Sequence, residues 1–223
     1  MNKNTAILIF ANSAEKDAVL KPLQSRSLFK TLNSDVISCA QKTGLPYFHY
    51  SEDEQVGLTF GDRFTNAIQS IFDKGFKSVI AIGNDTPHLK AKHILKTEQK
   101  LETHQCVLGP SKDGGFYLMG LNKSHFNTEA FLKLPWQTKH LNRSVFKILQ
   151  SNNTSTYFLE QLVDIDSKKD IKFILDSFKS FSKTLKTLLI TLIDIDKTIF
   201  SNYILSLQRV TIQNPHNKGS PFI

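Results

Sequence analysis

Short apolar runs of strand character alternate with segments of helical periodicity over the first 178 residues of the chain. The predicted strands are Thr5–Phe10, Pro46–Tyr50, Lys77–Ile82, Gln105–Leu108, Phe116–Leu121 and Tyr157–Leu162. The predicted helices are Ser25–Thr43, Phe60–Lys74, His88–Leu101, His140–Gln150 and Ser167–Phe178. Right-handed crossovers between parallel strands place such helices on both faces of one sheet. The alternation therefore predicts an α/β fold with a doubly wound, mostly parallel sheet.

The carboxyl ends of the predicted strands are the expected place for a ligand, because open α/β sheets bind ligands in the crevice beyond those ends. The chain leaves the sheet there after Phe10, Ile82 and Leu108. The residues that directly follow the first two of these positions are Ala11, Asn12, Gly83 and Asn84. We expect these residues to line a substrate site.

Asp85 follows a buried strand-like run in the segment VIAIGNDTPHL, and Pro87 stiffens the exit toward a helix. A carboxylate in this position faces the ligand crevice, where a hard oxygen ligand suits Mg²⁺ or Mn²⁺ bound to phosphates. The structural alternative is that Asp85 only caps the helix that starts near His88. The segment taken alone favours neither interpretation.

A second candidate is the turn in LGPSKDGGFYLMGL, where Asp113 is followed by Gly114 and Gly115. Glycines let the backbone approach a ligand closely and adopt positive φ. The same residues also suit an ordinary hairpin turn. No Cys–His or Ser–His pair occurs in a context typical of a protein nucleophile, and Asp113 is the best candidate for a general base toward an acceptor hydroxyl.

The segments IGNDTPHL, LGPSKDGGFYLMGL, LPWQT and VDIDSKKDI follow one another in this order. The pattern resembles a bacterial family of predicted glycosyltransferases, the DUF2064 type, whose members are similar to GT-A glycosyltransferases and to small nucleotidyltransferases. The stretch QVGLTFGDR, which starts at Gln55, also resembles the Gln–x–Gly…Gly–(Glu/Asp)–Arg stretch of that family. The resemblance covers about Thr5–Phe178 and implies a nucleotide-diphospho-sugar transferase-like domain over residues 1–178.

The resemblance implies roles for particular residues. Asp85 corresponds to the metal-binding aspartate of the family, and Asp113 with the two glycines after it would shape the sugar or acceptor side. Trp136 and Thr138 lie at the family's Pro–Trp–Ser–Thr position, where an aromatic ring stacks on a sugar. A plain core or lid residue is the alternative for Trp136.

Two Asp–Ile–Asp triplets are present, at residues 164–166 and 194–196. The first immediately precedes a predicted helix, so Asp166 suits a helix N-cap. In related nucleotidyltransferases an aspartate at this helix start also reaches the metal, which makes Asp166 a candidate second metal ligand beside Asp85. The second triplet lies outside the matched region and is interpreted as incidental.

The first loop departs from the family pattern Phe–Ala–Lys–x–Pro–x–x–Gly–x–Val–Lys–Thr–Arg–Leu. The residues that replace the two lysines, the glycine and the arginine are Asn12, Leu20, Asp17 and Pro22. Such a loop is expected to hold the phosphates of a nucleotide with backbone amides and cations. Lys21 is a candidate replacement cation, with Lys16 and Arg26 as further candidates.

The formal charge of +8 comes from lysines that are scattered along the chain, which argues against a nucleic-acid partner. Residues 179–223 are predicted to form an appendage that packs on the domain or makes a homo-oligomer contact. Asp194, Asp196 and Lys197 interrupt its apolar run before about 18 residues, so stable membrane insertion is not expected. The two cysteines form no CxxC motif, and reduced thiols suit the cytoplasm.

The leading functional hypothesis is metal-dependent glycosyl transfer from a nucleotide-diphospho-sugar to an unknown small-molecule acceptor, with Mg²⁺ or Mn²⁺ bridging the diphosphate. The first alternative is nucleotidyl transfer to a phosphorylated small molecule, which needs the same fold, nucleotide and metal. The second is a degenerate, non-catalytic nucleotide-binding or scaffold protein, which the altered first loop favours.

Overall fold

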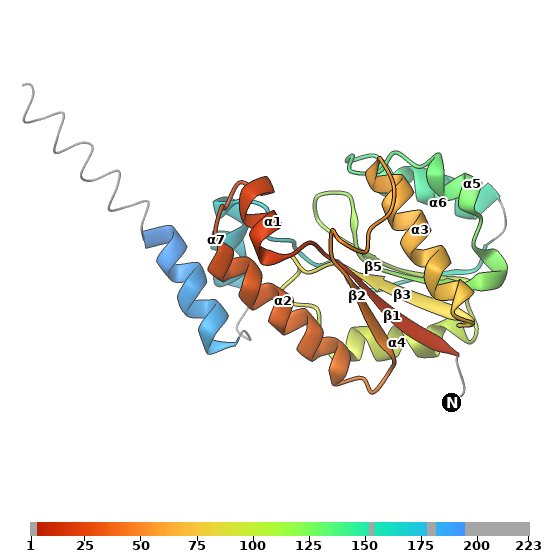
Figure 1. The fold of residues 1–223 in the computed structure, drawn as a ribbon, viewed down its shortest axis with the longest axis horizontal. Helices are drawn as coiled ribbons and strands as arrows, with labels where there is room; N and C mark the ends of the chain where they lie inside the picture. Colours follow the sequence, from red (N-terminus) through yellow and green to blue (C-terminus); the bar gives the residue numbers. More distant parts are fainter. Residues whose placement is uncertain (1–3, 152–153, 178–181, 195–223) are drawn as a thin grey trace, which may run out of the picture.

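The computed structural model describes residues 4–151, 154–177 and 182–194 of the chain. Within these residues, a six-stranded sheet has the order β2-β1-β3-β5-β4-β6 (Figure 1). The strands are β1 (Thr5–Phe10), β2 (Tyr47–Tyr50), β3 (Ser78–Ile82), β4 (Cys106–Pro110), β5 (Phe116–Asn122) and β6 (Thr156–Phe158). All neighbouring pairs are parallel except those of β5, which runs antiparallel to both β3 and β4. The predicted α/β, mostly parallel fold is confirmed.

Helices cover both faces of the sheet (Figure 1). The helices are α1 (Ala14–Leu20), α2 (Arg26–Gln41), α3 (Phe60–Asp73), α4 (Ala91–Leu101), the short 3-10 helix η1 (Lys123–His125), α5 (Thr128–Leu132), α6 (Leu141–Ser151) and α7 (Lys168–Ser177). One apolar core joins α3 and α6 to one face of the sheet, and a second joins α2 and α4 to the opposite face. Alternate strand residues divide between the two cores, as the period of two along a strand requires.

The periodicity of α3 shows how the sequence builds the first core. Phe64, Ile68, Ile71 and Phe72 are all buried on one side of this helix. Thr59 caps its first turn in a capping box with Asp62, so the helix start is fixed by local hydrogen bonds. The buried face then holds α3 across β1 and β3, with Phe60 at the rim of the sheet.

A third core lies beyond the rim and joins α1, α2 and α7. Residues 183–194 are also helical, and Leu185 and Leu189 from this segment are buried in the same core. This part of the appendage therefore packs on the domain. The rest of the appendage lies outside the described residues. It includes the second Asp–Ile–Asp triplet beyond Asp194, and the predicted oligomer contact falls there too.

Across the described ranges, none of the helices combines the length and apolarity that a bilayer crossing needs.

The element boundaries differ from the predicted ones in a few places. The helix expected from His88 starts at Ala91, because Pro87 and His88 form a turn and Lys90 is the N-cap. The last strand is limited to Thr156–Phe158. The short helices α1 and α5 were not predicted, and α1 occupies the segment expected to be a phosphate-binding loop.

Candidate functional site

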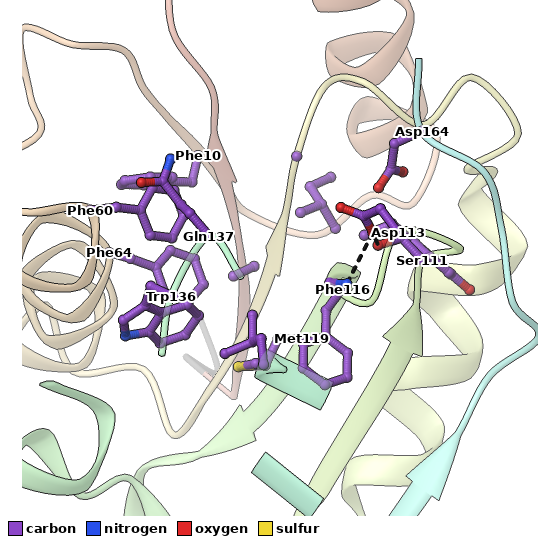
Figure 2. Close-up of a pocket in the computed structure, with 16 residues that line it drawn as sticks. Phe10, Phe60, Phe64, Ser111, Asp113, Phe116, Met119, Trp136, Gln137 and Asp164 are labelled. Carbon is purple, nitrogen blue, oxygen red and sulfur yellow. Dashed lines mark hydrogen bonds between the residues drawn. The ribbon is translucent and has the colours of Figure 1, made fainter. Parts of the chain in front are cut away.

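A cavity of about 200 Å³ opens at the end of the sheet where β1, β3 and β4 terminate. The residues that line it are Phe10, Phe60, Phe64, Ala81, Ile82, Gly83, Ser111, Asp113, Gly115, Phe116, Tyr117, Met119, Trp136, Gln137, Leu141 and Asp164. The position is the one that the strand topology predicts for a ligand. Figure 2 shows aromatic rings on one side of the cavity and the oxygen atoms of Ser111, Asp113 and Asp164 on the other.

The aromatic side is a packed cluster of rings. Phe60 and Phe64 are one helical turn apart on α3 and stack with their centroids 5.8 Å apart. Phe10 meets both rings edge to face, at 5.6 and 5.2 Å. Trp136 packs against Phe64 at 5.0 Å and donates its Nε1 hydrogen to the carbonyl oxygen of Phe131. Gly61 makes room for this contact, because a Cβ there would lie 2.6 Å from Cδ1 of Trp136.

The polar side is built by the turn between β4 and β5. Oδ1 of Asp113 accepts hydrogen bonds from the Ser111 hydroxyl and from the Gly115 backbone amide. Gly114 has a φ of +99°, and a Cβ at this position would meet the backbone of Lys139 at 2.8 Å. The two glycines therefore serve a tight turn that fixes the Asp113 carboxylate, with Oδ1 occupied and Oδ2 making no hydrogen bond within the described chain.

Asp164 brings a second carboxylate to this polar side. It accepts a short hydrogen bond from the Thr86 hydroxyl. Burial, together with the negative charges of Asp85 and Asp113, raises the pKa of Asp164 to about 8. The Asp164 carboxyl therefore keeps its proton to a higher pH than an ordinary aspartate, since its charged form is unfavourable so close to other carboxylates.

Asp85 lies beside this cavity and is paired with Lys21. The Lys21 ammonium Nζ is 2.8 Å from Asp85 Oδ2, and both side chains are partly exposed. Burial alone would lower the pKa of Lys21, but the charge of Asp85 and its hydrogen bond outweigh burial and raise that pKa above its ordinary value. Asp85 does not cap α4, whose N-cap residue is Lys90, so the capping alternative is wrong.

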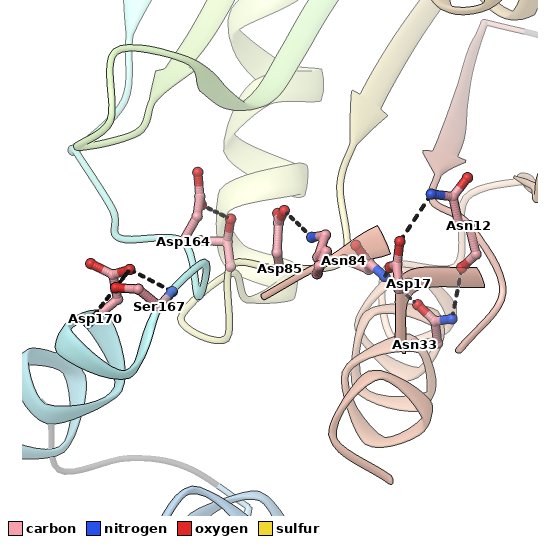
Figure 3. A network of polar contacts seen from close by, with 10 residues as sticks. Asn12, Asp17, Asn33, Asn84, Asp85, Asp164, Ser167 and Asp170 are labelled. Atoms are coloured by element: carbon pink, nitrogen blue, oxygen red, sulfur yellow. Dashed lines mark hydrogen bonds and ion pairs between the residues drawn. The ribbon is translucent and has the colours of Figure 1, made fainter. Parts of the chain in front are cut away.

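The backbone places the Asp164–Asp166 triplet next to Asp85. The amide of Ile165 donates to the Asp85 carbonyl oxygen at 2.8 Å, and the Ile165 side chain is fully buried. Asp166 is not the N-cap of α7. That role belongs to Ser167, which exchanges hydrogen bonds with Asp170 (Figure 3). The Asp166 carboxylate is therefore available to a ligand.

Asp85 and Asp166 are the candidate metal-binding pair. Partial burial, followed by the negative charge of Asp85, raises the pKa of Asp166 to about 6. This repulsion is relieved when a cation binds between carboxylates. No group of three His, Cys, Asp or Glu residues that could hold a metal occurs among the described residues. Two carboxylates nevertheless fit Mg²⁺, which usually takes one or two from the protein and completes its shell with water and substrate phosphate.

The segment expected to bind phosphates forms a polar network instead (Figure 3). Ser13 caps α1 and binds Glu52 through its backbone amide and hydroxyl. The buried Asp17 carboxylate accepts from the side-chain amides of Asn12 and Asn84, at 2.9 and 3.0 Å. Asn84 also donates to Asn33 at 2.6 Å. Asn12 and Asn84 therefore face this network and do not line the cavity.

The remaining predicted residues divide between the cavity and its surroundings. Gly83 lines the cavity, and a Cβ there would lie 3.2 Å from Oδ1 of Asp85. Ala11 is buried, and its amide donates to the Tyr50 carbonyl oxygen, which extends the pairing of β1 with β2. The Ala11 carbonyl oxygen bonds to the His49 ring. Thr138 turns its hydroxyl back to the Pro135 carbonyl oxygen, away from the cavity.

Sequence reasoning missed several lining residues. Gln137, next to the predicted Thr138, lines the cavity mouth with an unusual φ of 59°. Asp164 lines the cavity, although the sequence pattern predicts a functional role only for Asp166 of the same triplet. The spacing of two residues around a buried Ile165 was an available signal, because alternate residues of an extended segment point the same way. The Phe60–Phe64 pair was visible only as helix periodicity.

Residues 32–138 match the model of the DUF2064 family, which is described as an uncharacterized protein conserved in bacteria. The recognised resemblance is confirmed over these residues, which include Asp85, Asp113 and Trp136. The segment that contains Asp166 lies beyond the match. No curated protein matches the sequence.

The structure of a protein from Desulfovibrio desulfuricans G20, provisionally described as a nucleotide-diphospho-sugar transferase, is 19% identical, with a TM-score of 0.73 over 91% of this chain and 99% of that chain. This likeness establishes a nucleotide-diphospho-sugar transferase-like fold. The manganese complex of Rv0371C from Mycobacterium tuberculosis H37Rv is 11% identical and covers 79% of this chain and 100% of that one, with a TM-score of 0.44. A 4-diphosphocytidyl-2C-methyl-D-erythritol synthase from Anaerococcus prevotii DSM 20548 is 12% identical. The match covers 77% of this chain and 97% of that one, with a TM-score of 0.49. At TM-scores below 0.5, neither of these two informs this chain.

Proposed function

We propose that the protein transfers a glycosyl group from a nucleotide-diphospho-sugar to the hydroxyl of a small-molecule acceptor. The donor diphosphate lies at Asp85, Lys21 and Asp166, and the acceptor enters the cavity beside them. The transferase-like fold and the family match support a nucleotide-dependent transferase. The choice of glycosyl transfer rests on the chemistry of the cavity.

The observation that carries the proposal is the charge of the residues that line the cavity. Asp113 and Asp164 supply carboxyl groups, and the described lining residues include no Lys, Arg or His. The alternative, nucleotidyl transfer to a phosphorylated small molecule, would need cations at this place to hold the phosphate of the acceptor. A neutral acceptor with a hydroxyl group suits these carboxyl groups, because a carboxylate accepts a hydrogen bond from the hydroxyl and then takes the hydroxyl proton.

In the proposed reaction, the acceptor hydroxyl donates a hydrogen bond to Oδ2 of Asp113. The acceptor oxygen forms a bond to the anomeric carbon as the bond from that carbon to the phosphate oxygen breaks. The nucleoside diphosphate leaves with the bonding electron pair, and Asp113 holds the acceptor proton. The hydrogen bonds from Ser111 and Gly115 to Oδ1 fix the direction of this carboxylate before the acceptor binds.

Asp85 and Asp166 would hold Mg²⁺ or Mn²⁺ at the donor diphosphate. When bound, the cation supplies positive charge that stabilises the leaving group. Lys21 provides a second positive charge at the same place, since its ammonium pairs with Asp85 in the ligand-free protein.

We place this chemistry in the cytoplasm, because Cys39 and Cys106 are both free and buried, with thiol pKa values raised by burial to about 11 and about 12.

The test is to identify the product released from each nucleotide class. The protein is incubated with Mg²⁺ or Mn²⁺ and either nucleotide-diphospho-sugars or labelled nucleoside triphosphates. We expect nucleoside diphosphate from the sugars and no pyrophosphate from the triphosphates. Asp113→Asn, which keeps the shape of the side chain, should retain donor binding and lose turnover. Pyrophosphate release with a phosphorylated acceptor would instead establish nucleotidyl transfer.

A non-catalytic protein is favoured by one observation, which is that α1 replaces the expected phosphate-binding loop. Calorimetry with UDP-, GDP- and ADP-sugars in the presence of Mn²⁺ separates this alternative from the proposal. Binding of a nucleotide-sugar that is weakened in Asp85→Asn supports the transferase. Heat changes that are absent with every donor would favour a scaffold.

A further inference from the structure

We propose that the acceptor is a neutral alcohol or phenol whose carbon skeleton is a single ring or a short apolar chain. This inference rests on the proposed function and specifies the acceptor at the same site. The skeleton lies against the rings of Phe60, Phe64 and Trp136, and the hydroxyl points to Asp113 (Figure 2).

The size of the cavity sets the size of the group that it can hold. Its volume is about 200 Å³. An apolar protein cavity of about 150 Å³ binds benzene. Pockets that bury a whole drug-sized ligand measure about 300–1,000 Å³. The cavity is therefore too small for a nucleotide-sugar and large enough for one ring with a few additional atoms.

The walls favour a skeleton without further polar groups. Most of the side chains that line the cavity are apolar, and among the large ones are those of Phe10, Phe60, Phe64, Phe116, Met119 and Trp136. The only hydrogen-bonding atom of the Trp136 ring is already used by the Phe131 carbonyl oxygen. A sugar or other polyol would bury hydroxyls against these rings without partners, and each such group costs about 1–3 kcal/mol. A ring that carries one hydroxyl avoids that cost.

The polar groups converge at one end of the cavity, where they suit one hydroxyl. Ser111 and Gly115 hold Oδ1 of Asp113, so Oδ2 is directed to a ligand. Gln137 is exposed at the mouth and presents its amide from a left-handed backbone with a φ of 59°. Backbone strain of this kind is often retained where a side chain contacts a ligand.

Trp136 allows a direct binding test, because it is the only tryptophan of the chain. Its fluorescence, excited at a wavelength that selects tryptophan, is titrated with cyclohexanol, benzyl alcohol and myo-inositol on the full chain without nucleotide. Cyclohexanol and inositol share one ring size and differ in the number of hydroxyls. We expect a saturable change with the first two compounds and none with inositol.

Ala81→Leu is the variant that fills the cavity, since Ala81 lines it from β3. We expect this change to weaken cyclohexanol binding at least about tenfold, as the loss of apolar contact area predicts. Ala130→Leu is the matched control, because Ala130 lines a separate apolar cavity of about 60 Å³ beneath α5. Circular dichroism and the melting temperature of both variants show whether each one is folded.

Three outcomes of the alcohol-binding titrations would overturn the inference. These are stronger binding of inositol than of cyclohexanol, equal binding of cyclohexanol by the wild type and the folded Ala81→Leu variant, and competition between cyclohexanol and a nucleoside. The last outcome would make the cavity a base pocket. The proposed function fails separately, because donor turnover can be absent while the alcohols still bind. If the protein turns over a donor but neither alcohol changes the Trp136 fluorescence, the acceptor assignment is wrong and the proposed function stands.

Discussion

The Nζ ammonium of Lys21 lies 2.8 Å from Oδ2 of Asp85, so the carboxylate expected to bind a metal already carries a cation supplied by the chain. Lys21 is the residue directly after α1, in the segment that departs from the family pattern. The Lys21 side chain also lies over the Phe29 ring, 5.6 Å from its centroid, which helps to hold it in place. A divalent cation must displace this ammonium to reach Oδ2 of Asp85.

Lys21→Met should therefore increase the affinity of the ligand-free protein for Mn²⁺ several-fold. The variant keeps the apolar side chain and removes the charge that competes for Asp85. Donor binding should weaken at the same time, because the diphosphate loses a cation. Calorimetric titrations with Mn²⁺ alone, and with a nucleotide-sugar in saturating Mn²⁺, measure the two effects.

Lys16→Met is the control for this change, because Lys16 lies on α1 but is exposed. It should leave Mn²⁺ binding unaltered. Equal Mn²⁺ affinities in the wild type and Lys21→Met would show that the metal does not compete with Lys21 for Asp85.

Asp164 should make the ligand-free fold less stable as the pH rises. Burial and the nearby charges of Asp85 and Asp113 raise the pKa of its carboxyl to about 8, whereas an aspartate in an unfolded chain has a pKa of about 3.9. Between about pH 4 and pH 8, the folded protein keeps a proton that the unfolded chain has lost. Stability therefore falls as the pH rises across this window.

Asp164→Asn removes this penalty. The melting temperature of the variant minus that of the wild type should become more positive from about pH 4 to pH 8, measured in a chelator without nucleotide. Asp176→Asn, at an exposed position on α7, serves as the control and should show a smaller pH trend. If the melting temperature of Asp164→Asn differs from that of the wild type by the same amount at every pH, the raised pKa of Asp164 is contradicted.

Asp17→Asn should destabilise the protein by about 1–3 kcal/mol, because the buried carboxylate accepts hydrogen bonds from two amide donors. The substituted amide would present its own donor to Asn12 or Asn84. Urea unfolding of the variant gives the free energy of unfolding. The same change at the exposed Asp53 should stay within about 0.5 kcal/mol of the wild type.

The backbone of Gln137 can be separated from its side chain by two substitutions. Gln137→Gly relieves the cost of a positive φ, and Gln137→Ala does not. The glycine variant should therefore unfold with a free energy about 1 kcal/mol higher than the alanine variant. Both should bind benzyl alcohol more weakly than the wild type, in the Trp136 titration, if the amide contacts the acceptor. Unchanged binding in both would remove Gln137 from the site.

Periodicity was enough to predict the sheet and its long helices. Phe60–Lys74 was predicted as a helix and Phe60–Asp73 is observed, because a continuous apolar face and a capped start specify it locally. The helix α1 was missed for the opposite reason. Its seven residues carry little apolar periodicity, and it is stabilised by tertiary contacts from Glu52 and Asn84 that the local sequence does not reveal.

The candidate site was predictable where strand ends meet, and less so where loops fold back. Gly83 and the Asp113 turn lie at the cavity, as their positions after strands suggest. Thr138 does not, because the turn that follows Pro135 directs its hydroxyl to the backbone. Asn84 was expected to face the substrate, but the acceptor oxygens of Asp17 and Asn33 hold its amide on the other side of the strand end.

The antiparallel course of β5 has a consequence for how such a site can change. The Asp113 carboxylate lies in the turn of the β4–β5 hairpin, which is hydrogen-bonded to a neighbouring strand on each side, whereas Trp136 and Gln137 belong to an irregular segment between α5 and α6. Substitutions in that segment can reshape the pocket for a new partner without disturbing the carboxylate. Divergence of specificity among related chains should therefore concentrate between α5 and α6, while the proton-accepting hairpin stays fixed.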